Sequence, residues 1–196
     1  MTFESCLVLR ENAKVCLQIK ESRVASKSIL CLDLGSTTGW ALLTCSAAGF
    51  NMVSGNWDFR PGRFDGAGLR YVRFRKQLLE VLDSGEVDRV YFEEVRRHIG
   101  ADAARVYGAL FGVVTGLCEE FAIPYEGIPV GTIKRAWTGK GNASKELMIE
   151  QARSRGYPVT DDNEADAIAL AHYAHTRDSD LCGDVVEKDR YTGVLS

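Results

Sequence analysis

Two short apolar segments of the sequence each end abruptly in an acidic residue. The run from Ile29 to Leu32 is followed by Asp33, and the run from Val90 to Phe92 is followed by Glu93. Continuous apolar runs of this length are typical of strands that are covered on both faces of a sheet. The sequence therefore predicts an α/β protein in which two carboxylates lie at the ends of buried strands.

The other segments predict a mixed sheet of about five strands, three antiparallel and then parallel, with helices on both faces. A turn at 35–39 separates the first strand from two more that continue an antiparallel meander. Amphipathic periodicity then alternates with further short apolar runs. The expected elements are strands at 29–32, 40–44, 50–59, 90–92 and 123–128, and helices at 71–82, 102–121, 144–153 and 163–174.

The length of 196 residues suits one hydrophobic core. We expect a single folded domain over residues 28–176. Residues 1–27 form an N-terminal extension, for which a hairpin is one possible arrangement. Residues 177–196 form a polar C-terminal tail that we expect to be loose.

Composition and charge exclude several classes of protein. The chain is 45% hydrophobic and 26% charged, and it has no run of about 20 apolar residues that could span a bilayer. Its first residues lack the pattern of a signal peptide, so we expect a cytoplasmic protein without a membrane partner. The formal net charge of -3 does not indicate nucleic-acid binding. Any DNA contact must then depend on a local basic patch and on bound cations.

The cysteines do not indicate a metal site or a disulfide framework. The chain has six of them and no C-x-x-C pair. We expect reduced thiols, most of them buried.

A third acid, Asp166, lies inside the apolar segment from Ala165 to Ala174. Burying an unpaired carboxylate is unfavourable, so three such acids indicate a bound cation. Carboxylate oxygens suit Mg²⁺ or Mn²⁺, and two ions about 4 Å apart can hydrolyse a phosphodiester. Asp162 and Asn163 lie four and three residues before Asp166, so they share its helix face. Either residue could provide a fourth ligand.

Four segments together resemble the successive motifs of RuvC-type Holliday-junction resolvases, particularly their phage-encoded relatives. The resemblance covers residues 28–175 in the correct order. The segments are ILCLDLGSTTGWALL, VYFEEV with GADAARVYGALFGV, VGTIKRAWTGKGNASKELM and DDNEADAIALAHYA.

This resemblance implies an RNase H-like fold, a homodimer with one active site per subunit, and paired incisions in four-way DNA junctions. It implies Mg²⁺ as cofactor, with Mn²⁺ as a substitute and two ions per site. By resemblance, Asp33, Glu93 and Asp166 match metal-binding catalytic acids, and Asn163 falls where the family often has a fourth Asp. Lys134 and Lys145 match lysines near the active centre.

The chain departs from the family pattern at two places. Asn163 can offer a carbonyl oxygen to a metal ion but cannot act as a base, which puts metal affinity in doubt. Where well-studied members carry an aromatic residue after the strand Glu, this chain has Arg96, Arg97 and His98. Arginine can stack on bases or pair with phosphates, so we expect Arg96 and Arg97 to contact DNA.

A second basic segment is a candidate phosphate-binding surface. It contains Lys134, Arg135, Lys140 and Lys145, and Gly139 and Gly141 allow close backbone approach. A charge cluster is often only a solvated surface, but this one lies between the fifth strand and the helix that carries Asp166.

Three further features have a structural interpretation beside a functional one. Gly108, Gly112 and Gly116 recur every four residues in a predicted helix and indicate close packing against a sheet or a partner helix. Trp137 could stack on a base or belong to the core. His172 lies on an apolar helix, where packing is expected rather than proton transfer.

Two other functions remain open from the sequence. The segment Asp33 to Gly39 also resembles the phosphate loop of sugar kinases and actin-like ATPases, which clamp a nucleotide between two such domains. This chain has room for one, so we expect no nucleotide cofactor. A junction-binding protein that has lost cleavage is the non-enzyme alternative, suggested by Asn163 and by the unexplained first 27 residues.

Overall fold

The computed structural model describes residues 26–46, 49–95, 100–178 and 190–191. Most of the predicted N-terminal extension, together with Arg96, Arg97 and His98, lies outside these ranges. The elements in chain order are β1 (Lys27–Asp33), β2 (Thr37–Ser46), β3 (Gly49–Asp58), α2 (Leu69–Asp83), β4 (Arg89–Glu94), α3 (Ala101–Glu120), β5 (Tyr125–Pro129), α4 (Val130–Thr138), α5 (Lys145–Ser154), α6 (Asp162–Arg177) and β6 (Arg190–Tyr191).

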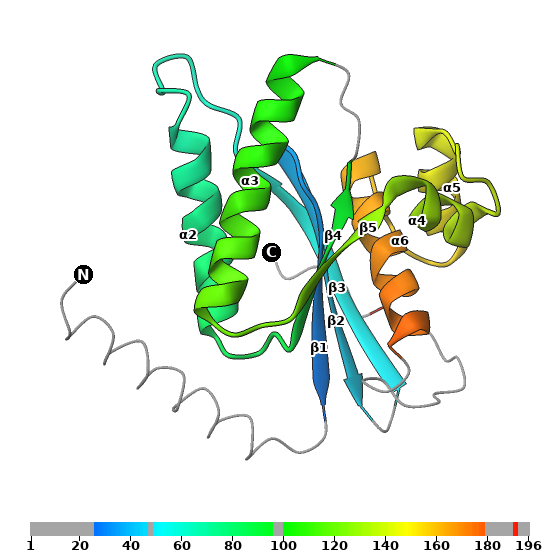
Figure 1. The fold of residues 1–196 in the computed structure, drawn as a ribbon. Helices are drawn as coiled ribbons and strands as arrows, with labels where there is room; N and C mark the ends of the chain where they lie inside the picture. Colours follow the sequence, from blue (N-terminus) through cyan, green and yellow to red (C-terminus); the bar gives the residue numbers. More distant parts are fainter. Residues whose placement is uncertain (1–25, 47–48, 96–99, 179–189, 192–196) are drawn as a thin grey trace.

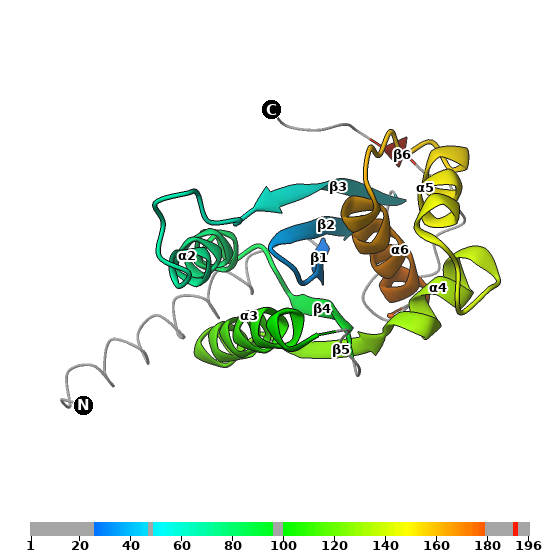
Figure 2. The ribbon, with the colours of Figure 1, turned by 90° about the horizontal axis from the view of Figure 1, so that it is seen from above.

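The strands form one six-stranded sheet in the order β5-β4-β1-β2-β3-β6. β1, β2 and β3 pair antiparallel, whereas β4 pairs parallel with both β1 and β5. The predicted meander followed by parallel strands is confirmed. Figures 1 and 2 show α2 and α3 on one face of the sheet and α4, α5 and α6 on the other.

The buried side chains divide into two cores because β1 supplies both faces of the sheet. Ile29 and Cys31 belong to the core under α6, and Leu30 and Leu32 belong to the core under α2 and α3. All four are at most 1% exposed. A strand in this position cannot alternate polar and apolar residues, which explains the continuous apolar run before Asp33.

Helix α6 lies directly on the sheet, and its sequence shows why it can do so. Its buried residues include five alanines, Ala165, Ala167, Ala169, Ala171 and Ala174. Such small side chains let the helix approach β1 and β2 closely. None of the helices in the described part of the chain is long and apolar enough to cross a lipid bilayer.

The segment that the sequence analysis treated only as a basic stretch begins with a helix. α4 forms because Ile133 and Trp137, four residues apart, are both buried against α6. The helix ends at Gly139, whose φ of 79° suits glycine. Trp137 is 3% exposed and donates from Nε1 to the Met148 carbonyl, so it belongs to the core.

The structure corrects two other expectations and narrows a third to one of its alternatives. Within the polar tail, Arg190–Tyr191 pairs with β3 and adds a sixth strand. The glycine stripe of α3 does not pack on the sheet: a Cβ on Gly108, Gly112 or Gly116 would meet no atom within 4 Å in the described structure. Cys31 and Cys118 are free and buried as expected, but Cys45 is disulfide-bonded, so the prediction of reduced thiols is wrong for it.

Candidate active site

The first two acids lie side by side at the carboxyl ends of neighbouring parallel strands. The register pairs Leu32 of β1 with Phe92 of β4, so the next pair along the two strands is Asp33 and Glu93. Neighbouring strands are about 4.8 Å apart, and paired residues in a parallel ladder point to the same face. Because Cys31 and Tyr91, two residues earlier, both face the core under α6, Asp33 and Glu93 face α6 as well.

The beginning of α6 brings the third acid to the same edge of the sheet. Figure 1 shows the start of α6 beside the carboxyl ends of β1 and β4. Gly39 of β2 pairs with Asp33, and a Cβ on Gly39 would lie 1.9 Å from the Asn163 carbonyl oxygen. The first turn of α6 therefore packs directly against the backbone of Gly39, next to Asp33. Asp166, one turn further along α6, is placed close to both strand acids.

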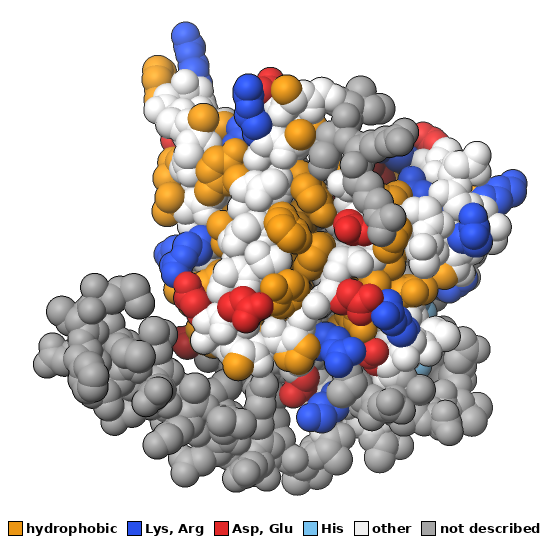
Figure 3. Space-filling view, in the orientation of Figure 1, with side chains coloured by type: hydrophobic (Ala, Val, Ile, Leu, Met, Phe, Trp, Pro, Cys, Tyr) orange, Lys and Arg blue, Asp and Glu red, His pale blue; other side chains and the backbone are white. Residues whose placement is uncertain are grey.

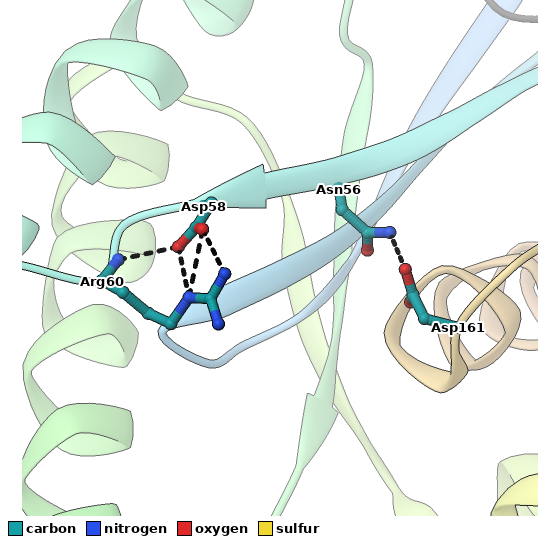
Figure 4. Close-up of polar contacts among 4 residues, drawn as sticks. All are labelled: Asn56, Asp58, Arg60 and Asp161. Carbon is teal, nitrogen blue, oxygen red and sulfur yellow. Dashed lines mark hydrogen bonds and ion pairs between the residues drawn. The ribbon is translucent and has the colours of Figure 1, made fainter.

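Polar contacts with β3 hold the first turn of α6 in this position. Asp161 caps the helix by accepting from the Glu164 amide, and it also accepts from the side chain of Asn56 (Figure 4). The buried Glu164 accepts a hydrogen bond from Ser54 at 2.7 Å. These contacts come from residues that the sequence analysis did not select.

Burial and the charges of neighbouring acids raise the pKa values of Asp33, Glu93 and Asp166. Desolvation raises the pKa of Glu93 to about 7, with Asp166 adding to the rise. Desolvation also raises the pKa of Asp166 to about 6, and Asp162 contributes. The pKa of Asp33 is raised well above its usual range by desolvation and then by Glu93, Asp166 and Asp162. The carboxylates are therefore close enough to act on one another.

Two lysines stand beside the acids. Lys134 of α4 lowers the pKa of both Glu93 and Asp166, and its Nζ donates to the Ala143 carbonyl at 3.1 Å. Lys145, the first residue of α5, forms an ion pair with Asp162 and lowers the pKa of Asp33. The structure thus brings together both lysines that the sequence resemblance indicated.

The chemistry of these donors fits a hard divalent cation. Asp166 Oδ1 is buried and has no hydrogen-bond partner among the described residues, as expected of an oxygen that binds a metal ion. Among the residues that the structure describes, no three His, Cys, Asp or Glu side chains form a ready-made metal cage. Ligation of one ion by Asp33, Glu93 and Asp166 therefore requires their side chains to turn toward a common point.

The structure separates the remaining candidates. Asn163 and Asp162 both lie in the first turn of α6, and Asp162 is the one that affects the pKa of Asp33 and Asp166. Arg135 and Lys140 are exposed on the α4 side, and among the described residues no contact links them to the acids.

His172 contacts the rings of Trp137 and Tyr157, and burial lowers its pKa to about 4, which confirms its packing role.

The residue that the sequence analysis missed is Gly39, which it assigned to a turn. The structure places Gly39 inside β2, under the first turn of α6. A glycine within a strand often marks close approach of another backbone, which is the signal that could have identified it.

Comparison with known proteins agrees with the resemblance seen in the sequence motifs. No protein-family model matches the chain. The chain is 29% identical over 164 residues to crossover junction endodeoxyribonuclease RuvC from two strains of Nitratidesulfovibrio vulgaris, a match that covers 81% of this chain and 98% of the relative.

Solved structures share the fold. RuvC of Thermus thermophilus superimposes with a TM-score of 0.61 at 22% identity, covering 76% of this chain and 95% of that one. The same protein in complex with a Holliday junction substrate gives the same TM-score. A yeast mitochondrial Holliday junction resolvase gives a TM-score of 0.51 at 14% identity. The chain is therefore similar to RuvC in sequence and shares its fold, and the expected mixed α/β fold is confirmed.

Replacing Gly39 by alanine tests how α6 is positioned. The added Cβ would overlap the Asn163 carbonyl, so α6 must shift away from β2. We expect Gly39→Ala to destabilise the fold by about 1–3 kcal/mol and to weaken Mg²⁺ binding, measured by urea unfolding and by calorimetric titration. Gly66→Ala is the control, because a Cβ there meets nothing within 4 Å. Equal behaviour of the two variants would contradict this role for Gly39.

The raised pKa of Glu93 predicts a pH-dependent cost of folding. A carboxyl whose pKa is higher in the folded state stabilises the fold below its unfolded pKa, and this contribution is lost as pH rises through about 7. In EDTA, Glu93→Gln should therefore gain stability relative to the unchanged protein between pH 5 and pH 8, by on the order of 2–3 kcal/mol. Urea unfolding at both pH values measures this, and a constant difference would refute the prediction.

Proposed function

We propose that this homologue of RuvC is a divalent-metal-dependent endonuclease that cleaves four-way DNA junctions and related branched DNA. One observation carries the proposal: Asp33, Glu93 and Asp166, far apart in the sequence, converge at one edge of the sheet beside two lysines. The names of the sequence relatives, crossover junction endodeoxyribonucleases, support the substrate class.

The metal ligands in this proposal are Asp33, Glu93 and Asp166, with Asp162 or Asn163 as the fourth. Mg²⁺ suits these oxygen donors, Mn²⁺ can replace it, and the number of acids is sufficient for two ions. When bound, the ions would lower the pKa of an attacking water and stabilise the leaving oxygen of the phosphodiester. The raised pKa values of the acids support this role, because a cation would offset the repulsion between them.

Lys134 and Lys145 would orient the scissile phosphate. Lys134 is anchored by the Ala143 carbonyl, so its charge is held at a fixed place beside Glu93 and Asp166. Lys145 is mostly exposed and pairs with Asp162, and a phosphate could replace that partner. Arg135 and Lys140 would extend the basic surface along the DNA, and Arg96 and Arg97 remain proposed DNA contacts.

The alternative, a junction-binding protein without cleavage, rests on Asn163. A neutral amide cannot serve as a base and contributes no charge to metal binding. Asp162 lies next to Asn163, and its effect on the pKa of Asp33 and Asp166 places its charge within reach of both acids. This proximity favours an active nuclease.

We also propose a homodimer that forms through α3. The stripe of Gly108, Gly112 and Gly116 faces open space, and Phe111 beside it is 40% exposed. Figure 3 shows hydrophobic side chains gathered on the face formed by α2 and α3. Glycine at every fourth residue lets a second helix approach closely, so a second copy of this chain would bury this face.

Substitution of the acids tests the proposed nuclease. Asp33→Asn, Glu93→Gln and Asp166→Asn should each slow cleavage of a labelled four-way junction in Mg²⁺ by about 100-fold or more, because each removes a metal ligand. Junction binding on native gels should persist. Denaturing gels measure the nicks.

The control for these variants is Glu80→Gln, which changes an exposed acid on α2 that forms an ion pair with Lys76. It should cut at the normal rate. Undiminished cleavage by Asp166→Asn would show that the site is wrongly assigned. Binding without any nicks by the unchanged protein would support the non-enzyme alternative.

Placing a charge in the glycine stripe tests the dimer. Gly112→Lys has space within the subunit and should leave the fold intact, but it would bury a charge in the proposed interface. Sedimentation equilibrium should then report the mass of a single chain, 21.6 kDa, where the unchanged protein gives twice that value. Gly66→Lys, at another open glycine, should remain dimeric, and dissociation of both variants would contradict the placement of the interface.

A further inference from the structure

A hollow lies next to the acids on the opposite side of the sheet edge from α6. It has a volume of about 400 Å³ and is formed where the segments after β1 and β4 meet the beginnings of α2 and α3. Leu34, Gly35 and Ser36 follow directly after Asp33, and Val95 follows shortly after Glu93. The hollow therefore borders the two strand acids. The remaining lining residues are Arg70, Asp102, Ala103, Val106 and Tyr107.

The charged group that distinguishes this hollow is Arg70, the second residue of α2. Its Nη1 donates to the Ser36 hydroxyl at 2.9 Å, which holds the guanidinium at the loop after Asp33. Its Nε is buried and has no hydrogen-bond partner in the described structure. A buried unsatisfied donor on a cation is costly, and an anion would offset that cost.

No acid among the described residues neutralises Arg70. Other arginines of the same region are ion-paired: Arg73 with Asp65, Arg75 with Glu120, and Arg105 with Asp102. Asp102, the acid that lines the hollow, is thus paired elsewhere and is almost fully exposed. Within the described part of the chain, the partner of Arg70 is the neutral Ser36, so its charge is available to a ligand.

The position of Arg70 completes a pattern of charge around the acids. Lys134 and Lys145 lie on the α4 and α5 side, and Arg70 lies on the α2 and α3 side. A DNA strand that crosses the acids from one side to the other would meet a basic group before and after them. The hollow is within the range of volumes that hold small ligands, and Leu34, Val95 and Val106 give it apolar walls.

We infer that Arg70 and this hollow form a subsite for the nucleotide next to the scissile phosphate. The guanidinium binds the phosphate of that nucleotide, and the apolar walls contact its sugar and base. Tyr107 fixes one wall, since its hydroxyl donates to the Glu93 carbonyl at 3.0 Å. This inference rests on the proposed function, because it assumes that a DNA strand lies across the acids.

Salt dependence of binding tests the phosphate contact. A labelled four-way junction is titrated with the full chain in Ca²⁺, which we use in place of Mg²⁺ to limit cleavage, over a range of salt concentrations. Arg70→Gln should raise Kd about tenfold and lower the slope of log Kd against log salt by about one. Arg75→Gln removes an arginine from the same helix that is paired with Glu120, and it should change neither quantity.

Two further variants separate the subsite from a structural role. Ser36→Ala removes the hydrogen bond to Arg70 but keeps its charge, so the salt slope should stay unchanged. Ala103→Phe fills the hollow and should weaken binding while the slope stays unchanged. Equal slope loss in Ser36→Ala and Arg70→Gln would mean that Arg70 only supports the loop. Unchanged affinity in Ala103→Phe would overturn the placement of a nucleotide in the hollow.

The outcome for the unchanged protein distinguishes the two proposals. If it neither binds nor cuts the junction, the proposed function fails. If it binds and cuts, and Arg70→Gln matches Arg75→Gln in affinity and slope, then the proposed function stands and the subsite is wrong.

Discussion

The structure depends on one electrostatic constraint, the gathering of like-charged carboxylates at a partly buried edge of the sheet. Asp33 and Glu93 are adjacent by strand register, and Asp166 joins them from α6. Their pKa values are raised because burial and mutual repulsion both oppose ionisation. Such an arrangement is unfavourable for the fold by itself, so it must be stabilised elsewhere. The two hydrophobic cores on either side of β1 provide that stabilisation.

The approach of α6 to the sheet determines whether the acids meet. A face rich in alanine lets this helix lie close to β1 and β2. Gly39 has no side chain, so it leaves space for the first turn of α6. Hydrogen bonds from Asn56 and Ser54 then fix the first turn. Once α6 is docked, the backbone of Asp166 is fixed and only its side chain can rotate. The packing of α6 therefore determines the geometry of the site.

Basic groups lie on both faces of the sheet near the edge that carries the acids. α4 and α5 carry Lys134 and Lys145 on one face, and α2 carries Arg70 on the other. This distribution makes the net charge of -3 compatible with the nucleic-acid substrate that we propose. In that proposal the positive charge that contacts DNA is local, and bound cations would add to it.

The sequence by itself determined the strands that end in Asp33 and Glu93, because burial on both faces requires an unbroken apolar run. It also indicated the helix that carries Asp166. The resemblance to RuvC-type resolvases indicated Lys134 and Lys145. Only the tertiary structure decided that Gly39 underlies α6, that the glycine stripe of α3 faces outward, and that Arg70 lies at the loop after Asp33. These facts depend on contacts between residues distant in the chain. Local pattern records whether a residue is buried or exposed, but not which element covers it.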